Sequence, residues 1–81
     1  MDRIHLHILN PEGTMAETDV SLVTLPGTVS PFTVLPGHAA LVTALAEGDV
    51  RYVENDEEKR LHVRGGFAEV CDNKVVACVE V

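Results

Sequence analysis

Apolar and polar side chains alternate along much of this chain, most clearly in residues 3–9. Every second residue there is aliphatic, in the order Ile4, Leu6 and Ile8. His5 and His7 fall between them. Because successive side chains of a β-strand point to opposite faces, this period of two predicts a strand with one buried face and two histidines toward solvent.

Other segments rich in Val, Leu, Ile and Thr are also predicted as strands. They are residues 14–16, 19–25, 32–35, 39–45, 49–53, 59–64, 66–71 and 74–81. Residues 39–45 also suit a helix by composition, but the short space between Gly37 and Gly48 favours a strand. Turn residues recur about every eight to twelve positions. The sequence predicts one all-β domain over residues 1–81, a small β-sandwich of about eight to ten short, mostly antiparallel strands.

The negative charge of this chain limits the kinds of molecule that it can bind directly. The 81 residues include 6 basic and 13 acidic side chains, for a net charge of −7. Nucleic acids and anionic lipid surfaces are bound through Lys and Arg, so we expect neither as a direct partner. The sequence starts without the apolar core of a secretory leader and has no apolar run of membrane-spanning length. We expect membrane association only through other proteins.

The two cysteines flank a predicted turn at Asp72-Asn73. A two-residue hairpin there would place Cys71 opposite Lys74 and Cys78 opposite Phe67. The two cysteines would then be four ladder steps apart, about 13 Å, which exceeds the reach of a disulfide. We predict free thiols in a reducing compartment, with Cys78 as a small core residue.

Two groups of residues raise the question of a metal site. His5 and His7 at i, i+2 could chelate zinc or copper, but the sequence marks no third ligand, and two surface histidines are favoured. Residues 54–58 are acidic, yet they lack the glycine and ligand spacing of a calcium loop. A solvated hairpin turn is the preferred interpretation. We expect no metal and no cofactor.

No motif of catalysis is found. The chain has no phosphate-binding loop, no GxSxG sequence and no CxxC pair. Gly65-Gly66 lies between two predicted strands, which favours a bulge or a sharp bend at a sheet corner over phosphate binding. His62 alternates with Leu61 and Val63 and should face solvent or a partner. The sequence predicts a binding protein and not an enzyme.

The most informative segment is residues 25–45, LPGTVSPFTVLPGHAALVTAL. It holds two Pro-Gly turns, Pro26-Gly27 and Pro36-Gly37, with His38 directly after the second. Together with the sequences Val63–Val70 and Asn73–Val76, this segment resembles the N-terminal β-sandwich of the epsilon subunit of F-type ATP synthase. The resemblance covers essentially the whole chain, in order.

The resemblance implies a non-catalytic rotor subunit in the central stalk. Such a subunit binds the gamma subunit and the membrane c-ring, and couples proton or sodium ion flow to ATP synthesis at the cytoplasmic face of the bacterial inner membrane. The gamma contacts it implies are His38, Leu41 and Thr43. The c-ring contacts it implies are Thr28, Val29, Ser30, Pro31 and Phe32.

The chain departs from the family pattern in two ways. The sequence ends at Val81, where the family's C-terminal helical hairpin begins, so we expect these 81 residues to lack the regulatory arm. The loop 28–32 has neither the glycine nor the glutamate that is frequent there. Two alternatives stay open. His38 could be a corner residue bonded to a backbone carbonyl, and the chain could be a free-standing ligand- or metal-binding sandwich.

Overall fold

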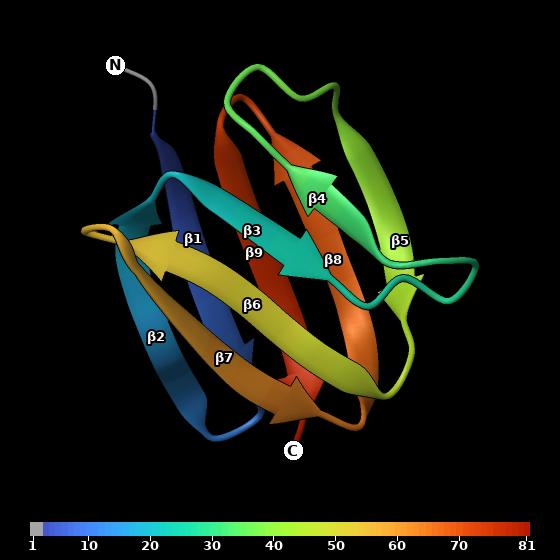
Figure 1. Cartoon of the computed structure of the whole chain (residues 1–81). Helices are drawn as coiled ribbons and strands as arrows, with labels where there is room; N and C mark the ends of the chain where they lie inside the picture. The colour runs from blue at the N-terminus through green and yellow to red at the C-terminus, as the bar shows by residue number, and fades with distance from the viewer. Residues whose placement is uncertain (1–2) are drawn as a thin grey trace.

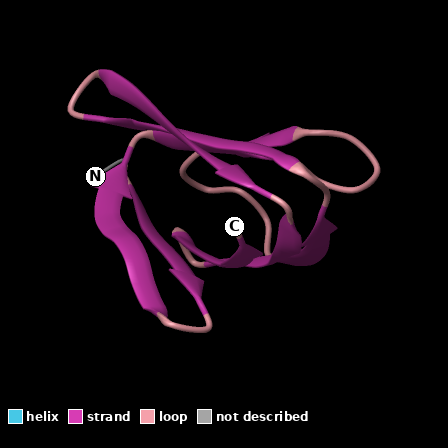
Figure 2. Ribbon diagram, turned by 90° about the horizontal axis from the view of Figure 1, so that it is seen from below, coloured by secondary structure: helices cyan, strands magenta, loops and turns pink. Residues whose placement is uncertain are grey.

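The computed structural model describes residues 3–81, which form nine β-strands in two sheets. Figure 1 shows the two sheets face to face, and Figure 2 shows the two layers from below. The expected all-β sandwich of short, mostly antiparallel strands is therefore confirmed. These residues contain no helix that could cross a membrane.

The larger sheet has five strands in the order β2-β1-β9-β8-β5. In chain order these are β1 (Ile4–Asn10), β2 (Gly13–Val20), β5 (Leu41–Leu45), β8 (Gly65–Cys71) and β9 (Lys74–Glu80). Neighbouring strands run antiparallel, except β1 and β9, which are parallel. The first and last strands of the chain thus lie side by side in the middle of one sheet (Figure 1).

The smaller sheet has four antiparallel strands in the order β4-β3-β6-β7. They are β3 (Leu22–Leu25), β4 (Phe32–Val34), β6 (Gly48–Glu54) and β7 (Glu57–Val63). The edge strands of the two sheets are therefore β2, β5, β4 and β7.

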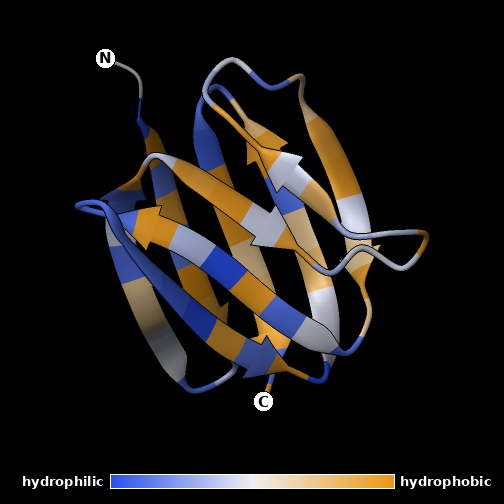
Figure 3. Cartoon of the chain, in the orientation of Figure 1, coloured by the Kyte–Doolittle hydropathy of each residue, from blue (hydrophilic) through white to orange (hydrophobic). Residues whose placement is uncertain are grey.

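The core lies between the sheets and is built from aliphatic side chains. The largest fully buried side chains are Ile4, Leu6, Ile8, Leu25, Val20, Val23, Val34, Val50, Val63, Val70 and Val75. The alternation of apolar and polar residues is visible along β6 in Figure 3. Because each strand turns one face inward, the polar residues between the apolar ones stay on the surface.

The prediction of a short strand at 14–16 followed by a long one at 19–25 is wrong. Gly13–Val20 is one strand, and the break comes at Ser21, where the chain passes from one sheet to the other. The Ser21 backbone N–H donates to the Val53 carbonyl at 2.9 Å in the second sheet. This change of partners, which no local sequence signal marks, ends β2.

Three hairpins turn through two-residue loops, of which Pro11 and Glu12 form the one between β1 and β2. Asn55 and Asp56 join β6 to β7 with φ of 53° and 64°, and Asp72 and Asn73 join β8 to β9 with φ of 51° and 61°. Asparagine and aspartate tolerate this left-handed backbone, which a two-residue hairpin of this twist requires. The acidic segment 54–58 is thus a hairpin turn and its flanks.

Gly66 sits just after the corner where β7 passes to β8, with φ of 137°. The register of β8 with both its neighbours is regular at this point, which excludes a bulge, and the bend at this sheet corner lies at Arg64, directly before Gly65. A side chain at Gly66 would collide with the carbonyl oxygen of Cys78. The register shift in this sheet lies instead between Ile8 and Leu9.

Both cysteines are free, and the predicted register is correct: Cys71 pairs with Lys74 and Cys78 with Phe67. The placement of Cys78 in the core is wrong. Val75, Ala77 and Val79 are the buried residues of β9, so Cys78 points to the opposite, outer side of the sheet and is half-buried.

Candidate partner-binding surfaces

Apolar side chains extend across the outer face of the five-stranded sheet. We define this outer face by six apolar residues from four strands, with the exposed Glu69 between two of them: Leu9, Val42, Ala44, Phe67, Val76 and Cys78. Val42 is 71% exposed and Phe67 is 54% exposed. An apolar surface that spans several strands is characteristic of a site where another protein binds.

A shallow groove of about 390 Å³ lies on this outer face, beside the β1–β2 turn and the end of β9. Its lining residues are Leu9, Asn10, Pro11, Gly66, Phe67, Cys78, Val79 and Glu80. They come from β1, from the β1–β2 turn and from the two C-terminal strands. The groove is open and nearly all apolar, so it is suited to apolar side chains of a protein partner and not to a polar ligand.

Strand β5 carries two of the three residues implied as gamma contacts. Leu41 and Thr43 share the inward-facing side of β5 with the buried Leu45, and Leu41 packs against the core. Val42 and Ala44, between them, point outward and are exposed. The side chains of β5 that a partner can reach on the outer face are therefore Val42 and Ala44.

His38, the third implied gamma contact, is half-buried beside its turn. Its Nδ1–H donates to the Ala39 carbonyl at 2.7 Å. Its ring lies 6.5 Å from the ring of Phe32, measured between centroids. The hydrogen bond to a backbone carbonyl that was expected of a corner histidine is therefore present. The rest of the ring surface is open to a partner.

The turn before His38 is held by a residue far away in the sequence. The side-chain Oδ1 of Asn73 accepts a hydrogen bond from the Gly37 N–H at 2.8 Å. The backbone carbonyl of Asn73 accepts from the His5 N–H at 2.9 Å. One asparagine therefore links the start of β1, the β8–β9 hairpin and the Pro36-Gly37 turn.

The five residues implied as c-ring contacts lie in the loop from β3 to β4 and at the start of β4. Thr28, Ser30 and Pro31 are exposed, and Val29 is 97% exposed. Phe32 begins β4 and is half-buried against the core. Of the apolar residues in this segment, only Val29 and Pro31 are fully available for contact.

The base of this loop is attached to β5. The Thr28 N–H donates to the Ala44 carbonyl at 3.2 Å, and the Ala46 N–H donates to the Pro26 carbonyl at 2.7 Å. The loop and β5 therefore belong to one hydrogen-bonded unit, although they belong to different sheets.

Two histidines each contact a pair of carboxylates. His5 donates from Nδ1 to Asp19 at 3.0 Å and from Nε2 to Glu17 at 2.9 Å. His62 donates from Nδ1 to Asp49 at 2.9 Å and from Nε2 to Glu47 at 3.2 Å. These hydrogen bonds to Glu17 and Asp19 raise the pKa of His5, and those to Asp49 and Glu47 raise the pKa of His62.

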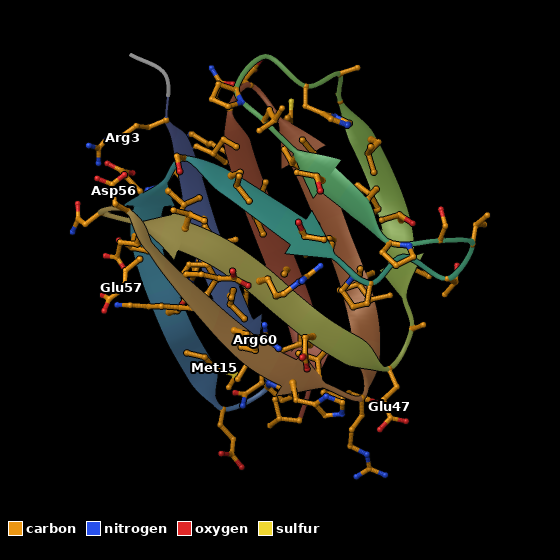
Figure 4. All side chains as sticks on the ribbon, viewed as in Figure 1. Arg3, Met15, Glu47, Asp56, Glu57 and Arg60 are labelled. Atoms are coloured by element: carbon orange, nitrogen blue, oxygen red, sulfur yellow. The ribbon has the colours of Figure 1, made fainter. Side chains whose placement is uncertain are left out.

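His7, expected beside His5, turns instead to the Thr14 hydroxyl at 2.8 Å. In residues 3–81 no three His, Cys, Asp or Glu side chains come together in a way that could hold a metal ion. Figure 4 shows Arg3 and Asp56 at one corner and Glu47, the partner of His62, at the opposite end.

Sequence reasoning did not find the outer face or its groove. Phe67, Val76 and Cys78 alternate with Ala68, Ala77 and Val79, so β8 and β9 carry apolar residues on both faces. That double apolar pattern was the available signal, because a strand with one solvated face normally alternates with polar residues.

Comparison with known proteins identifies the family. Residues 3–81 match the family described as ATP synthase, delta/epsilon chain, β-sandwich domain. The ATP synthase epsilon chain of Nitratidesulfovibrio vulgaris is 40% identical over 77 residues, which are 95% of this chain and 58% of that protein. The epsilon chain of Campylobacter fetus is 38% identical over 82 residues, 99% of this chain and 63% of that protein. The chain thus spans somewhat more than half the length of these relatives.

Solved structures share the fold. A chain of the Euglena gracilis mitochondrial ATP synthase, in a structure of OSCP, F1 and c-ring, superposes with a TM-score of 0.88 at 25% identity. The match covers 95% of this chain and 50% of that one. A chain of the Tetrahymena thermophila central stalk and c-ring has a TM-score of 0.80 at 16% identity, covering 96% of this chain and 63% of that one.

Epsilon chains are stalk subunits of the ATP synthase and not catalytic ones, in agreement with the expectation from the sequence. The match over residues 3–81 is to a family of ATP synthase subunits and not to a family of ligand- or metal-binding modules. With the nine strands of residues 3–81, its two Pro-Gly turns and this match, the chain belongs to the β-sandwich family of ATP synthase delta/epsilon chains.

Proposed function

We propose that this chain is a rotor subunit that joins the gamma subunit to the membrane c-ring and so couples proton or sodium ion flow to ATP synthesis. It is peripheral to the membrane, on its cytoplasmic face, and is held there by other subunits. Its gamma contacts lie around His38 and on the exposed side of β5, and the implied contacts Leu41 and Thr43 support that strand from its inner side. Its c-ring contacts lie in residues 28–32.

The attachment of the 28–32 loop to β5 is the observation that carries this proposal. Thr28 and Pro26 bond directly to Ala44 and Ala46. A force applied at the loop is passed through these bonds to β5 without crossing a flexible linker. That is the mechanical property a coupling element between two partners needs.

The loop is suited to apolar contact with the ring. Val29 is almost fully exposed, and Pro31 restricts the backbone. Surface ion pairs contribute under about 1 kcal/mol and weaken with salt. A buried valine contributes about 1.5–3 kcal/mol and depends little on moderate salt. Docking on the ring should therefore survive moderate salt.

A cysteine at position 29 tests the ring contact. Cys71 and Cys78 are first replaced by serine and alanine, so that Val29→Cys is the single thiol of this chain within the assembled enzyme. We expect cross-linking to the polar loop of the c-ring. We also expect Val29→Asp to reduce ion pumping, because it places a charge in an apolar contact, while Ser30→Ala pumps normally. No cross-link together with normal pumping in Val29→Asp would show that the loop does not touch the ring.

A further inference from the structure

Strand β5 differs from the other edge strands of the sandwich. Edge strands expose unpaired backbone groups, and proteins usually protect them with charge, proline or short length. β2 carries Glu17 and Asp19, and β7 carries four charged residues in Glu57–Arg60. β4 has only three residues and follows Pro31 directly. Within residues 3–81, β5 is the edge strand that is longer than three residues and has neither charge nor proline.

The backbone of β5 offers hydrogen-bonding groups on its free side. The Ala44 carbonyl accepts from Thr28, and the Ala46 N–H donates to Pro26, on the side away from β8. In an antiparallel strand the N–H and C=O of one residue point the same way, and alternate residues point the same way. Three further backbone groups therefore point away from β8: the N–H and C=O of Val42 and the N–H of Ala44. None of them forms a hydrogen bond with the backbone of another described residue.

The surroundings of β5 indicate what could pair with it. Val42 lies opposite Glu69 of β8, and the whole chain carries a net charge of −7. Two copies of the chain would repel one another at this edge. An extended segment with uncharged or basic side chains would satisfy the free backbone groups and face Glu69 favourably. This is strand addition, in which the backbone provides affinity and alternate side chains provide selectivity.

We propose that an extended, uncharged or basic segment of the gamma subunit adds to β5 as the sixth strand of the larger sheet. The inference rests on the proposed function, because it defines how the gamma contact is made. The segment bonds to the backbone of Val42 and Ala44, and its alternate side chains continue the apolar outer face. Leu41 and Thr43 then act from the inner side by holding β5 in register.

A pair of substitutions at one position separates strand addition from side-chain docking. Val42→Pro removes the free N–H and leaves the β5–β8 hydrogen bonds in place, because proline is tolerated where the N–H faces outward on an edge strand. Val42→Thr keeps the N–H and the β-branched shape. We expect Val42→Pro to weaken binding to the gamma subunit about tenfold or more, and Val42→Thr to stay within about threefold of the native chain.

Amide hydrogen exchange provides a second measurement that needs no substitution and remains decisive if Val42→Pro does not fold. In the free chain the amides of Val42 and Ala44 should exchange fast, since they lack a partner. In the complex with gamma both should be slowed strongly. Thr43, whose N–H faces β8, serves as the internal reference and should be protected in both states.

The outcomes separate the two proposals. Suppose that the native chain binds gamma. If Val42→Pro then binds gamma equally well, or if Val42→Pro and Val42→Thr weaken that binding equally, strand addition is overturned and the stalk function stands. Fast exchange of Val42 and Ala44 in the complex would overturn it as well. If the native chain does not bind gamma at all, the proposed function fails first and the inference fails with it.

Discussion

His5 shows how a single residue makes the stability of this domain depend on pH. It bridges Glu17 and Asp19 of β2, and it pairs with Lys74 across the parallel β1–β9 register. Its pKa is raised above the usual 6.5, and the pKa of Glu17 is lowered below 4.5, each mainly by the hydrogen bond between them. The folded state therefore holds the His5 proton more tightly than the unfolded chain, and His62 behaves in the same way.

The sign of the pH dependence follows from these shifts. The contribution of the two histidines to the free energy of unfolding is fully present below pH 6.5 and is lost as the pH rises through their raised pKa. The contribution of Glu17 is present above pH 4.5 and is lost as the pH falls through its lowered pKa. We expect urea titrations to give a lower free energy of unfolding at about pH 8 than at about pH 6. The double variant His5→Gln, His62→Gln should lose most of this slope. The same slope in both proteins would contradict the assignment.

At the scale of the element, β5 has an inner and an outer face that one pair of substitutions can distinguish. Leu41 packs against the core, and Val42 is exposed. Aspartate is unfavourable in any strand, so the two variants share that penalty. Leu41→Asp also removes an apolar contact and places a charge against the core, and should cost about 2 kcal/mol or more beyond Val42→Asp. Thermal unfolding followed by circular dichroism measures the difference. Equal melting temperatures would place Leu41 on the surface.

At the scale of the whole molecule, a core of small aliphatic residues leaves a thin stability margin. A domain of this size is stable by about 4–12 kcal/mol. Leu6 is fully buried in β1, between β2 and β9, and Leu6→Ala should cost about 2–5 kcal/mol. Leu35→Ala makes the same change at a residue that is 53% exposed and should cost under about 0.5 kcal/mol. Similar losses in both variants would mean that the core does not carry the stability.

The sequence by itself determined the features that depend on near neighbours. Alternation placed Ile4, Leu6 and Ile8 inward and His5 outward, because a strand has a period of two. Pairs such as Asp72-Asn73 determined the hairpin turns, because their backbone accepts a positive φ. The Pro-Gly turns and His38, taken in order, also carried the family resemblance, which the match over residues 3–81 confirms.

Only the tertiary structure decided the features that depend on pairing between distant segments. The parallel contact of β1 with β9 joins the two ends of the chain, and Ser21 ends β2 because its partner, Val53, belongs to the other sheet. The register of β8 and β9 puts Cys78 and Phe67 together on the outer face. The free edge of β5 exists because no strand within residues 3–81 lies beyond it. No local pattern encodes which strand has a neighbour, since that depends on how all nine pair at once.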